Sequence, residues 1–252
     1  MALTQYREIK NGNYGGKGFP ARRLTCSGTG PFGFIPFGNA GMANWAFHIM
    51  AGFTCPSSDE ATLTKTNSGT IGIAAGGLAL VSGATSGNNT TLQHLRAIAP
   101  AADKRFAFVC RMNWTVVAKG KGVFGLMNTA ADPIATPATD GVFFSKDTAG
   151  TGAIKSNLVG NSTAVTPVAV HTAVLATDYE YGLLYTPIDA NDGYCDFWYR
   201  AAGASDWTFS NRMTGGSGAA PQAALRATMN ITATDANALT ATYPWYGIAM
   251  EL

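Results

Sequence analysis

Strict two-residue alternation between residues 106 and 117 constrains the fold of this chain more than any other feature of its sequence. Apolar side chains occupy every second position there: Phe106, Phe108, Cys110, Met112, Trp114 and Val116. Polar side chains such as Arg111 and Asn113 alternate with them. Because successive side chains of a β-strand point to opposite faces, this segment is predicted to be a strand with one face in a hydrophobic core. Trp114 is therefore expected to be buried.

Short runs of β-branched and aromatic residues, separated by Gly, Asn, Asp and Pro clusters, continue along the chain. Glycine accounts for 30 of the 252 residues and charged residues for only 13%, which disfavours long helices. The further predicted strands are 123–127, 141–145, 153–159, 168–175, 179–186, 194–200, 225–232 and 245–252. About ten strands of this kind predict an all-β fold of two packed antiparallel sheets.

Three connections carry specific expectations. Residues 120–122 are predicted to turn strand 106–117 into strand 123–127 as a hairpin. Residues 187–193 are predicted to form a long hairpin tip. The alanine-rich segment 219–227 is the one candidate for a short helix, although it is equally compatible with a loop.

The composition of the chain changes near residue 67, and this change predicts that the chain has two parts. Residues 24–66 are rich in glycine and proline, with aromatic side chains such as Phe32 and Phe34 between them. Aromatic residues in that setting suggest a segment that docks onto a sheet. We therefore expect an extended, loop-rich N-terminal arm over residues 1–66 and a β-sandwich over residues 67–252.

The first 23 residues differ from the rest in charge. They carry five basic side chains and one acidic one, which leaves 12 basic and 14 acidic residues for the remainder. Their many turn formers predict an extended, irregular arm, either disordered or ordered on a partner. Aromatic anchors and basic groups would bind that partner. The expected contact residues are Tyr6, Arg7, Lys10, Tyr14, Lys17, Phe19, Arg22 and Arg23.

Charge and hydropathy exclude several classes of protein. A formal net charge of +2 lacks the strong positive field of a nucleic-acid binder, so no direct nucleic-acid contact is expected. The start of the chain does not read as a secretory signal, and the apolar run 71–81 is too short to span a bilayer. No zinc-ligand spacing is present among the cysteines, and reduced thiols without disulfides are expected at Cys26, Cys55, Cys110 and Cys195.

No motif in the chain predicts catalysis, a cofactor or a metal. Gly28–Gly33 matches GxGxxG, but Pro31 excludes the helix that a dinucleotide site requires. The nucleophile motif GxSxG is absent. No acidic or metal-ligating neighbour accompanies the three histidines, which are His48, His94 and His171.

Two further patterns have structural explanations. Asp189, Asn191 and Asp192 offer oxygen ligands that calcium could use, but a hairpin tip requires the same residue types and the EF-hand glutamate is missing. Asn-x-Ser/Thr triplets arise by chance in a threonine-rich chain. They begin at Asn88, Asn89, Asn113, Asn161 and Asn230.

An aromatic cluster near the end of the chain is the second candidate site. It consists of Tyr194, Trp198, Tyr199 and Trp207. Exposed tryptophans stack against sugar rings, although strand alternation sends about half of such residues into a core. Trp198 and Trp207 are the candidates for a glycan platform.

The order of the strands in the C-terminal two thirds of the chain adds a resemblance. The segments that carry it are Asp140–Ser145, Ala153–Asn157 with Asn161–Thr163, Tyr179–Tyr185, Cys195–Arg200 and the two closing strands 225–232 and 245–252. This succession resembles the concanavalin A-like jelly rolls in structural proteins of tailed bacteriophages, over about residues 70–252. The resemblance implies an antiparallel two-sheet jelly roll. Glycosidases of that fold present their carboxylates on a Glu-x-Asp-x-x-Glu strand, which is absent here, so no enzyme is expected.

The resemblance and the basic arm together predict a non-enzymatic virion protein of a tailed phage, made in the host cytoplasm. It would decorate or cement the capsid by binding the major capsid protein and sister subunits, as a homo-oligomer with a trimer favoured. The alternative is a carbohydrate-binding, receptor-binding module of a tail fibre or spike that binds a host glycan. A glycan-cleaving enzyme is the third and least favoured interpretation.

Overall fold

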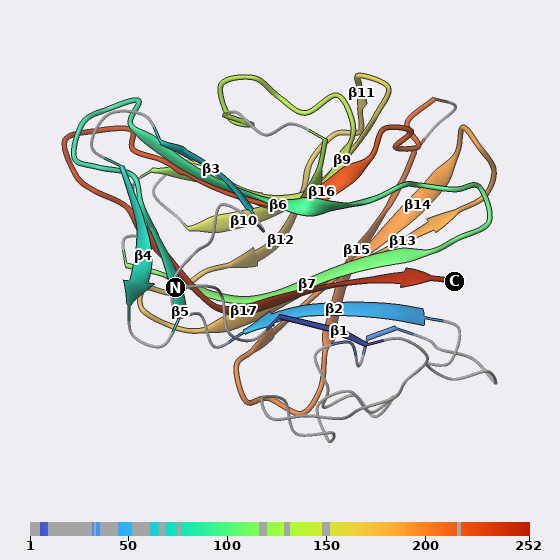
Figure 1. Cartoon of the computed structure of the whole chain (residues 1–252), viewed down its shortest axis with the longest axis horizontal. Coiled ribbons are helices and arrows are strands. Elements are labelled where there is room, and N and C mark those ends of the chain that lie inside the picture. The colour runs from blue at the N-terminus through green and yellow to red at the C-terminus, as the bar shows by residue number, and fades with distance from the viewer. Residues whose placement is uncertain are drawn as a thin grey trace.

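The computed structural model describes residues 6–9, 32, 34–35, 45–51, 61–65, 69–74, 77–115, 120–128, 132–147, 152–215 and 218–252. All regular structure in these ranges is β-strand. Every strand pair is antiparallel. The strands form two sheets that pack face to face (Figure 1). The predicted all-β, two-sheet sandwich is therefore confirmed.

The first sheet runs through the lower layer of Figure 1. Its strands, in order, are β1 (Tyr6–Ile9), β2 (Trp45–Ala51), β17 (Thr240–Glu251), β7 (Phe106–Trp114), β13 (Tyr179–Pro187), β14 (Gly193–Ala201) and β15 (Thr208–Thr214). The long β17 also pairs with β5 (Gly77–Val81), which pairs in turn with β4 (Thr70–Ala74).

The second sheet forms the upper layer of Figure 1. Its strands, in order, are β11 (Thr163–Ala164), β10 (Ala153–Gly160), β9 (Gly141–Lys146), β8 (Lys121–Met127), β16 (Leu225–Thr232), β6 (Asn89–Ile98) and β3 (Ala61–Lys65). Beside β11, β10 also pairs with β12 (Val168–Thr172).

The core lies between the two sheets, and β7 provides much of it. All of its described side chains that the alternation assigns to one face are buried: Phe106, Phe108, Cys110, Met112 and Trp114. Trp114 is 2% exposed, as predicted. Phe124 and Phe144 of the second sheet stack at 5.1 Å, and Tyr181 of the first sheet meets Phe124 edge-on at 5.2 Å. Burial raises the pKa of both core thiols, which are free cysteines, Cys110 and Cys195. The other two cysteines, Cys26 and Cys55, lie outside the described residues.

The hairpin predicted at residues 120–122 is wrong. β7 pairs with β13 and β17 in the first sheet, whereas β8 pairs with β9 and β16 in the second. The reason is visible at Gly122, where a Cβ atom would lie 2.2 Å from the Trp114 ring. The start of β8 therefore faces Trp114 across the core, and the chain crosses between the layers instead of pairing side by side.

The sheets take strands from both sides of residue 67, where the sequence predicted a boundary. β2 pairs with β17, and β3 pairs with β6. The backbone of β1 pairs with β2, so residues 6–9 are a strand, and this part of the arm is not irregular. A sheet edge can order a short segment through backbone hydrogen bonds alone, which the side-chain pattern does not reveal.

The helix considered at residues 219–227 is absent, because β16 begins at Leu225. Ala219 is 1% exposed and lies against Gly160, where a Cβ atom would be 2.3 Å from the Ala219 backbone. The alanines therefore provide a close approach to the second sheet. β12 ends at Thr172, earlier than predicted, because the chain turns with a hydrogen bond from Thr177 N to Val174 O.

The outer face of the first sheet is covered by a segment that precedes β2. Phe32, Phe34 and Ile35 pack there in a second hydrophobic cluster. The sheet contributes Ala107, Val109, Leu184, Trp245 and Ala249 to this cluster, and Trp45 of β2 joins them. The expectation that aromatic residues between glycines dock onto a sheet is confirmed at these positions. In the described part of the chain, no helix is long and apolar enough to cross a membrane.

Candidate functional site

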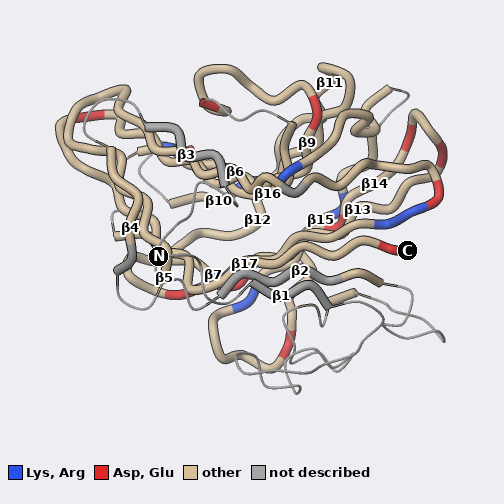
Figure 2. The backbone as a smooth tube through the Cα atoms, viewed as in Figure 1, with Lys and Arg blue, Asp and Glu red and all other residues tan. Residues whose placement is uncertain are grey.

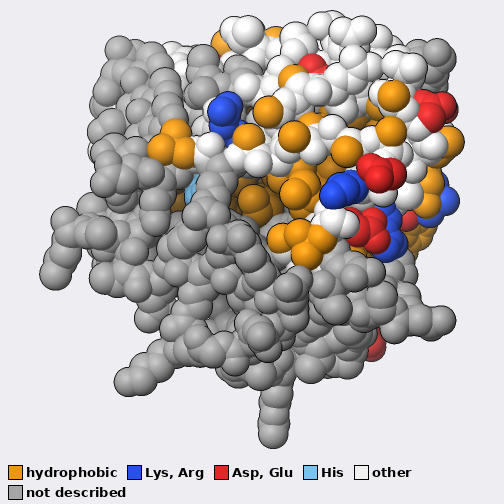
Figure 3. Space-filling model, turned by 45° about the vertical axis from the view of Figure 1, so that its right-hand side comes forward, with side chains coloured by type: hydrophobic (Ala, Val, Ile, Leu, Met, Phe, Trp, Pro, Cys, Tyr) orange, Lys and Arg blue, Asp and Glu red, His pale blue; other side chains and the backbone are white. Residues whose placement is uncertain are grey.

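A pocket of about 210 Å³ opens at one end of the sandwich, where three connections meet. The β6–β7 connection, the β13–β14 hairpin and the segment before β16 line it with Pro100, Ala101, Ala102, Tyr185, Pro187, Asp189, Ala190, Ala220, Pro221 and Gln222. The first two of these connections lie at the right-hand side of Figure 1. Figure 3 brings that side forward and shows hydrophobic side chains gathered beside neighbouring acidic and basic ones.

The tip of the β13–β14 hairpin supplies the polar rim of the pocket. Asp189 Oδ1 accepts hydrogen bonds from the backbone N–H groups of Asn191 at 2.7 Å and Asp192 at 2.9 Å. This Asx-type turn fixes the carboxylate at the rim, and the acidic tip is marked in Figure 2. The residues considered for calcium are thus a hairpin tip, as the alternative explanation held. Across the described ranges, no group of three or more His, Cys, Asp or Glu side chains could hold a metal ion.

Asn191 joins the hairpin tip to the segment before β16. Its backbone oxygen accepts hydrogen bonds from Gly218 N at 3.0 Å and Ala220 N at 3.4 Å. Its side-chain Oδ1 accepts a hydrogen bond from Gln222 Nε2 at 3.2 Å. The carboxylate of Asp189 and the amides of Asn191 and Gln222 therefore form one connected rim.

Asp140 anchors this rim from inside the molecule. The residue is 6% exposed and precedes β9. Its Oδ1 accepts hydrogen bonds from Gln222 N at 2.7 Å and Asn161 N at 3.2 Å. One buried carboxylate thus positions the Gln222 backbone relative to the β10–β11 turn.

Tyr185 lies under the apolar side of the pocket. It is 2% exposed, and its ring stacks on Phe106 with the centroids 4.8 Å apart. A Cβ atom at Gly193 would lie 2.2 Å from the Tyr185 hydroxyl, so only glycine leaves room for that hydroxyl. Burial raises the pKa of Tyr185. Its hydroxyl is therefore protonated at neutral pH and can donate a hydrogen bond.

This arrangement suits a small neutral ligand that has hydroxyl groups and one apolar face. A carboxylate accepts hydrogen bonds from adjacent hydroxyls, and an amide both donates and accepts. Proline and alanine side chains at positions 100–102 and 220–221 offer a surface for C–H groups. A concave, mostly apolar pocket with a few converging polar groups is the usual form of a ligand site.

Trp198 and Trp207, the predicted glycan platform, come together around Phe34 on the outer face of the first sheet. The Phe34 ring lies 5.0 Å from the Trp198 ring and 4.9 Å from the Trp207 ring. A Cβ atom at Gly182 would lie 2.4 Å from Phe34, so this glycine forms the floor under the phenylalanine. Both tryptophans are half-buried. They hold the N-terminal segment, and much of their ring surface is occupied by it.

A buried ion pair lies next to Trp207. Arg200 Nη2 lies 2.6 Å from Glu180 Oε2, and the two side chains are 5% and 6% exposed. The Arg200 guanidinium also lies 4.4 Å from the centre of the Trp207 ring. The cation is therefore neutralised by Glu180 and stacked on Trp207, which fixes the orientation of that ring.

The remaining two aromatic residues of the predicted cluster lie elsewhere. Tyr194 is covered by Arg212, whose guanidinium carbon lies 3.9 Å from the ring centre. Tyr199 packs against the core and stacks on His171 at 4.5 Å. Burial lowers the pKa of His171, so this residue is neutral at pH 7. The predicted cluster of four is thus divided, because Tyr199 faces the core while Trp198 and Trp207 lie on the outer face of the first sheet.

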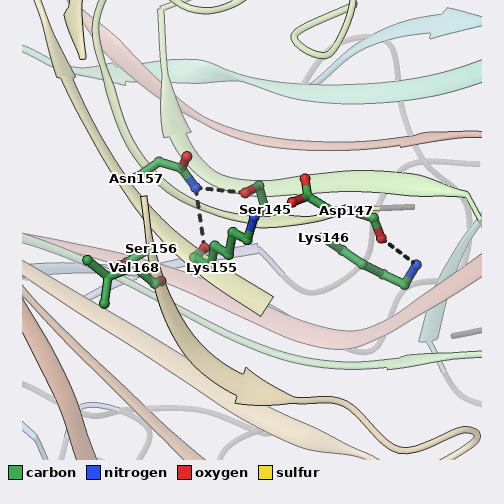
Figure 4. A network of polar contacts seen from close by, with 7 residues as sticks. All are labelled: Ser145, Lys146, Asp147, Lys155, Ser156, Asn157 and Val168. Atoms are coloured by element: carbon green, nitrogen blue, oxygen red, sulfur yellow. Dashed lines mark hydrogen bonds and ion pairs between the residues drawn. The ribbon is translucent and has the colours of Figure 1, made fainter. Parts of the chain in front are cut away.

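The outer face of the second sheet carries a ladder of polar side chains that bond to one another. Gln93 Nε2 donates to Thr228 Oγ1 at 2.8 Å, and Asn230 Nδ2 donates to Thr91 Oγ1 at 2.6 Å. Figure 4 shows Asn157 directed toward Ser145, its partner at 2.9 Å, while Lys146 extends away from them. Since these groups satisfy one another, they offer a ligand fewer free partners than the pocket rim does.

Both glutamates whose side chains are described are held by arginines. Glu180 pairs with Arg200, and Glu251 pairs with Arg105 at 2.8 Å. The hydrogen bond from Arg105 lowers the pKa of Glu251. A glycosidase needs a general acid with a raised pKa opposite a second carboxylate. The lowered pKa of Glu251 is the opposite of what such an acid needs.

The eight residues predicted to bind a partner through the arm have no described side chains. The structure gives the backbone of Tyr6 and Arg7 within β1. The other six, Lys10, Tyr14, Lys17, Phe19, Arg22 and Arg23, lie outside the described residues. Their role stays a prediction.

Comparison with known proteins identifies the fold. No protein-family model and no curated protein matches the sequence. Among solved structures, peanut lectin superposes with a TM-score of 0.59 at 8% identity, covering 82% of this chain and 98% of the lectin. The chain has the concanavalin A-like jelly-roll fold.

Other solved structures extend this likeness to enzymes and to proteins without a known role. A prokaryotic β-1,3-1,4-glucanase (lichenase) derived from a mouse hindgut metagenome gives a TM-score of 0.56 at 15% identity, covering 80% of this chain and 98% of the enzyme. A protein of unknown function from Shewanella oneidensis MR-1 gives 0.55 at 12% identity, covering 82% of this chain and 87% of that one. Lectins and glycosidic hydrolases share this fold, so the fold alone does not decide between binding and catalysis.

Sequence reasoning missed the pocket because its lining has no chemical signature. Pro100, Ala101 and Ala102 lie in a connection, and Ala220 and Pro221 belong to the segment considered for a helix. Only the hairpin tip with Asp189 was noticed. Its position at a junction of three connections depends on strand order, which side-chain pattern does not specify.

Proposed function

We propose that this chain is a non-catalytic carbohydrate-binding protein whose end pocket holds one sugar unit of a glycan. The observation that carries the proposal is the pair of polar groups, Asp189 and Gln222, that line the pocket beside apolar side chains and are both held by Asn191. Adjacent sugar hydroxyls would donate to the Asp189 carboxylate and exchange hydrogen bonds with the amides. The C–H face of the ring would lie on the prolines and alanines. The lectin-like fold is compatible with this role.

The proposal excludes hydrolysis on chemical grounds that can be tested. Glycoside cleavage uses a carboxylic acid and a carboxylate on opposite sides of the bond. Among the described residues that line the pocket, Asp189 is the only acidic one, so no second carboxylate faces it there. A ligand bound there would be retained and not cleaved.

A pocket-filling variant tests this function. Ala102 is exposed and lines the pocket, so Ala102→Trp would occupy the space of the sugar. Ala236→Trp is the matched control, because Ala236 is an exposed alanine in the β16–β17 connection, at the opposite end of β16 from the pocket. On an array of immobilised glycans, we expect wild type and Ala236→Trp to bind the same glycan and Ala102→Trp to bind at least about tenfold more weakly, a loss of about 1.4 kcal/mol.

Two outcomes would contradict the proposal. One is equal binding by both variants, and the other is no binding of wild type to any glycan on the array. Release of reducing sugar by wild type would show that the protein is an enzyme and would overturn the non-catalytic assignment.

A second function, assembly of a tailed-phage virion through the major capsid protein, is favoured by one observation. The first 23 residues carry five basic side chains and one acidic one, whereas the rest of the chain is slightly acidic. A basic arm of this kind binds acidic surfaces in a salt-dependent way. Co-purification of the full chain with capsids, weakened by Arg22→Glu/Arg23→Glu, would support this role. Unchanged attachment of the double variant across a salt series would contradict it.

A further inference from the structure

We propose that the end pocket selects a sugar unit that carries an N-acetyl group, and that Tyr185 is the residue that recognises this group. The inference rests on the proposed function, because it names the class of sugar that the same pocket holds. An acetamido group has one hydrogen-bond donor, one acceptor group and one methyl group. The pocket offers a partner for each of the three.

The wall of the pocket is mostly apolar. Seven of the ten described residues that line it are alanine or proline, and the other three are Tyr185, Asp189 and Gln222. Hydroxyl groups that face alanine or proline side chains lose the hydrogen bonds that water gave them. A methyl group gains from the same wall, because its burial removes apolar surface from water. The lining therefore favours a sugar with an apolar substituent over one that carries only hydroxyl groups.

Tyr185 brings an unused hydrogen-bond donor to this wall. The residue lines the pocket although it is only 2% exposed, and no other described residue forms a hydrogen bond with its hydroxyl. Stacking on Phe106 and the close approach of Gly193 fix the ring in place. Burial above all raises the pKa of this hydroxyl, so it stays protonated and acts as a donor. A ligand carbonyl that reaches it would pair a polar group that is otherwise unsatisfied.

Asp189 supplies the complementary acceptor. Its Oδ1 accepts the backbone N–H groups of Asn191 and Asp192, whereas no described residue donates a hydrogen bond to its Oδ2. Asp189 and Tyr185 line the same pocket, and the charge of Asp189 is among the causes that raise the pKa of Tyr185. An acetamido N–H would donate to Oδ2 while its carbonyl accepts from Tyr185. A sugar hydroxyl could bond to the same two groups, but it has no methyl group to cover the alanine and proline wall.

Methyl glycosides that differ in one substituent, an acetamido group against a hydroxyl group, test the inference. The pairs are N-acetylglucosamine with glucose and N-acetylgalactosamine with galactose. Each sugar is titrated into the ¹⁵N-labelled full chain, and the shifts of backbone amide signals give its Kd. For at least one pair, we expect wild type to bind the N-acetylated sugar about tenfold or more tightly than its partner. In Tyr185→Phe this preference should fall about fivefold or more, because the carbonyl loses its donor while the ring remains.

Tyr181→Phe is the matched control. Tyr181 lies on the same strand, β13, and is 1% exposed, and its hydroxyl likewise has no partner among the described residues, but it does not line the pocket. This variant should keep the wild-type preference. Circular dichroism checks that both variants are folded. The comparison of the two sugars of a pair on wild type needs no variant, so it decides the inference even if Tyr185→Phe does not fold.

Three results would overturn this inference. They are a wild-type chain that binds the hexose of each pair as tightly as the N-acetylated sugar, a Tyr185→Phe variant that keeps the full preference, and an equal loss of preference in both variants. In each of these cases the pocket would still hold a sugar, so the proposed function would stand. A wild-type chain that binds none of the four sugars would also overturn the inference, and the glycan array would then decide the proposed function separately.

Discussion

The tryptophan pair on the first sheet and the pocket at the end of the sandwich differ in what occupies them. Trp198 and Trp207 are in contact with Phe34 of the same chain. The pocket has a volume of about 210 Å³ and is open to solvent. Small residues line it, and Asp189 and Gln222 form its rim. The first region is rich in aromatic surface but is already used, and the second has little aromatic surface but is available.

The comparison teaches that aromatic content does not locate a binding site in this sandwich. The outer face of the first sheet is apolar through Ala107, Val109 and Leu184 and must be covered. The two tryptophans complete that cover. A ligand site needs free hydrogen-bonding groups beside an unfilled space, and the hairpin tip meets that requirement.

The largest expected effect follows from removing the side chain that occupies the tryptophan pair. Phe34 is 8% exposed, and Phe34→Ala should lower the free energy of unfolding by about 3–5 kcal/mol, because a buried aromatic ring is lost. Urea unfolding followed by tryptophan fluorescence measures it. Phe209→Ala is the control, since Phe209 also contacts Trp198 but is 53% exposed, and it should cost less than about 1 kcal/mol. Equal costs would mean that Phe34 is not part of a packed core.

A smaller effect is expected from the floor beneath Phe34. Gly182→Ala places a methyl group where the ring is only 2.4 Å away, so Phe34 must move and about 2–3 kcal/mol of stability should be lost. Gly72→Ala adds the same methyl group to β4 with no atom within 4 Å. This control should be neutral within about 0.5 kcal/mol. Similar melting temperatures for both variants would contradict the close contact.

On the pocket side, Asp140 should act by positioning the rim. Asp140→Ala leaves the N–H groups of Gln222 and Asn161 without this acceptor and should cost about 1 kcal/mol of stability and weaken glycan binding. Asp140→Asn keeps an oxygen in the same place and should restore most of both. Isothermal titration calorimetry with a glycan that wild type binds measures the affinity of each variant. Equal binding by Asp140→Ala and wild type would show that the rim does not depend on this carboxylate.

The smallest effect concerns the ion pair between Arg105, which directly precedes β7, and Glu251 at the end of β17. Arg105 lowers the pKa of Glu251, so the pair stabilises the fold above the unfolded-state pKa, and this contribution is lost as the pH falls through the lower folded-state pKa. Both side chains are about a quarter exposed, which limits the contribution to about 1 kcal/mol or less. The stability difference between wild type and Glu251→Gln should therefore vanish in acid. A difference that grows in acid would contradict the assignment.

The sequence predicted the parts of the fold that side-chain periodicity encodes. The alternation through Trp114, the hairpin tip at residues 187–193 and the strand 225–232 agree with the structure. Side-chain periodicity did not predict which of the two sheets each strand joins. Gly122, for example, is typical of a turn in the sequence, but in the structure it makes room for Trp114 across the core. β6 was missed because its buried residues include Gln93 and Thr91, which are polar but hydrogen-bonded across strands.

The pocket was less predictable than the fold for a related reason. Its residues come from three connections that are distant in the sequence, and the hydrogen bond between Gln222 N and Asp140 joins positions 82 apart. The use of Trp198 to hold Phe34 likewise depends on a contact between distant segments. Side-chain periodicity shows on which face of its strand a residue lies, but it does not show which distant segment covers that face.

Nuclear magnetic resonance titration of the uniformly ¹⁵N-labelled chain with a glycan selected on the array tests the central claim most directly. Binding in the pocket predicts shifts of the backbone amide signals of residues 101–104, 188–193, 218–220 and 222, while the indole N–H signals of Trp198 and Trp207 stay in place. Shifts of those two indole signals without changes around Asp189 would contradict the account and return the binding site to the outer face of the first sheet.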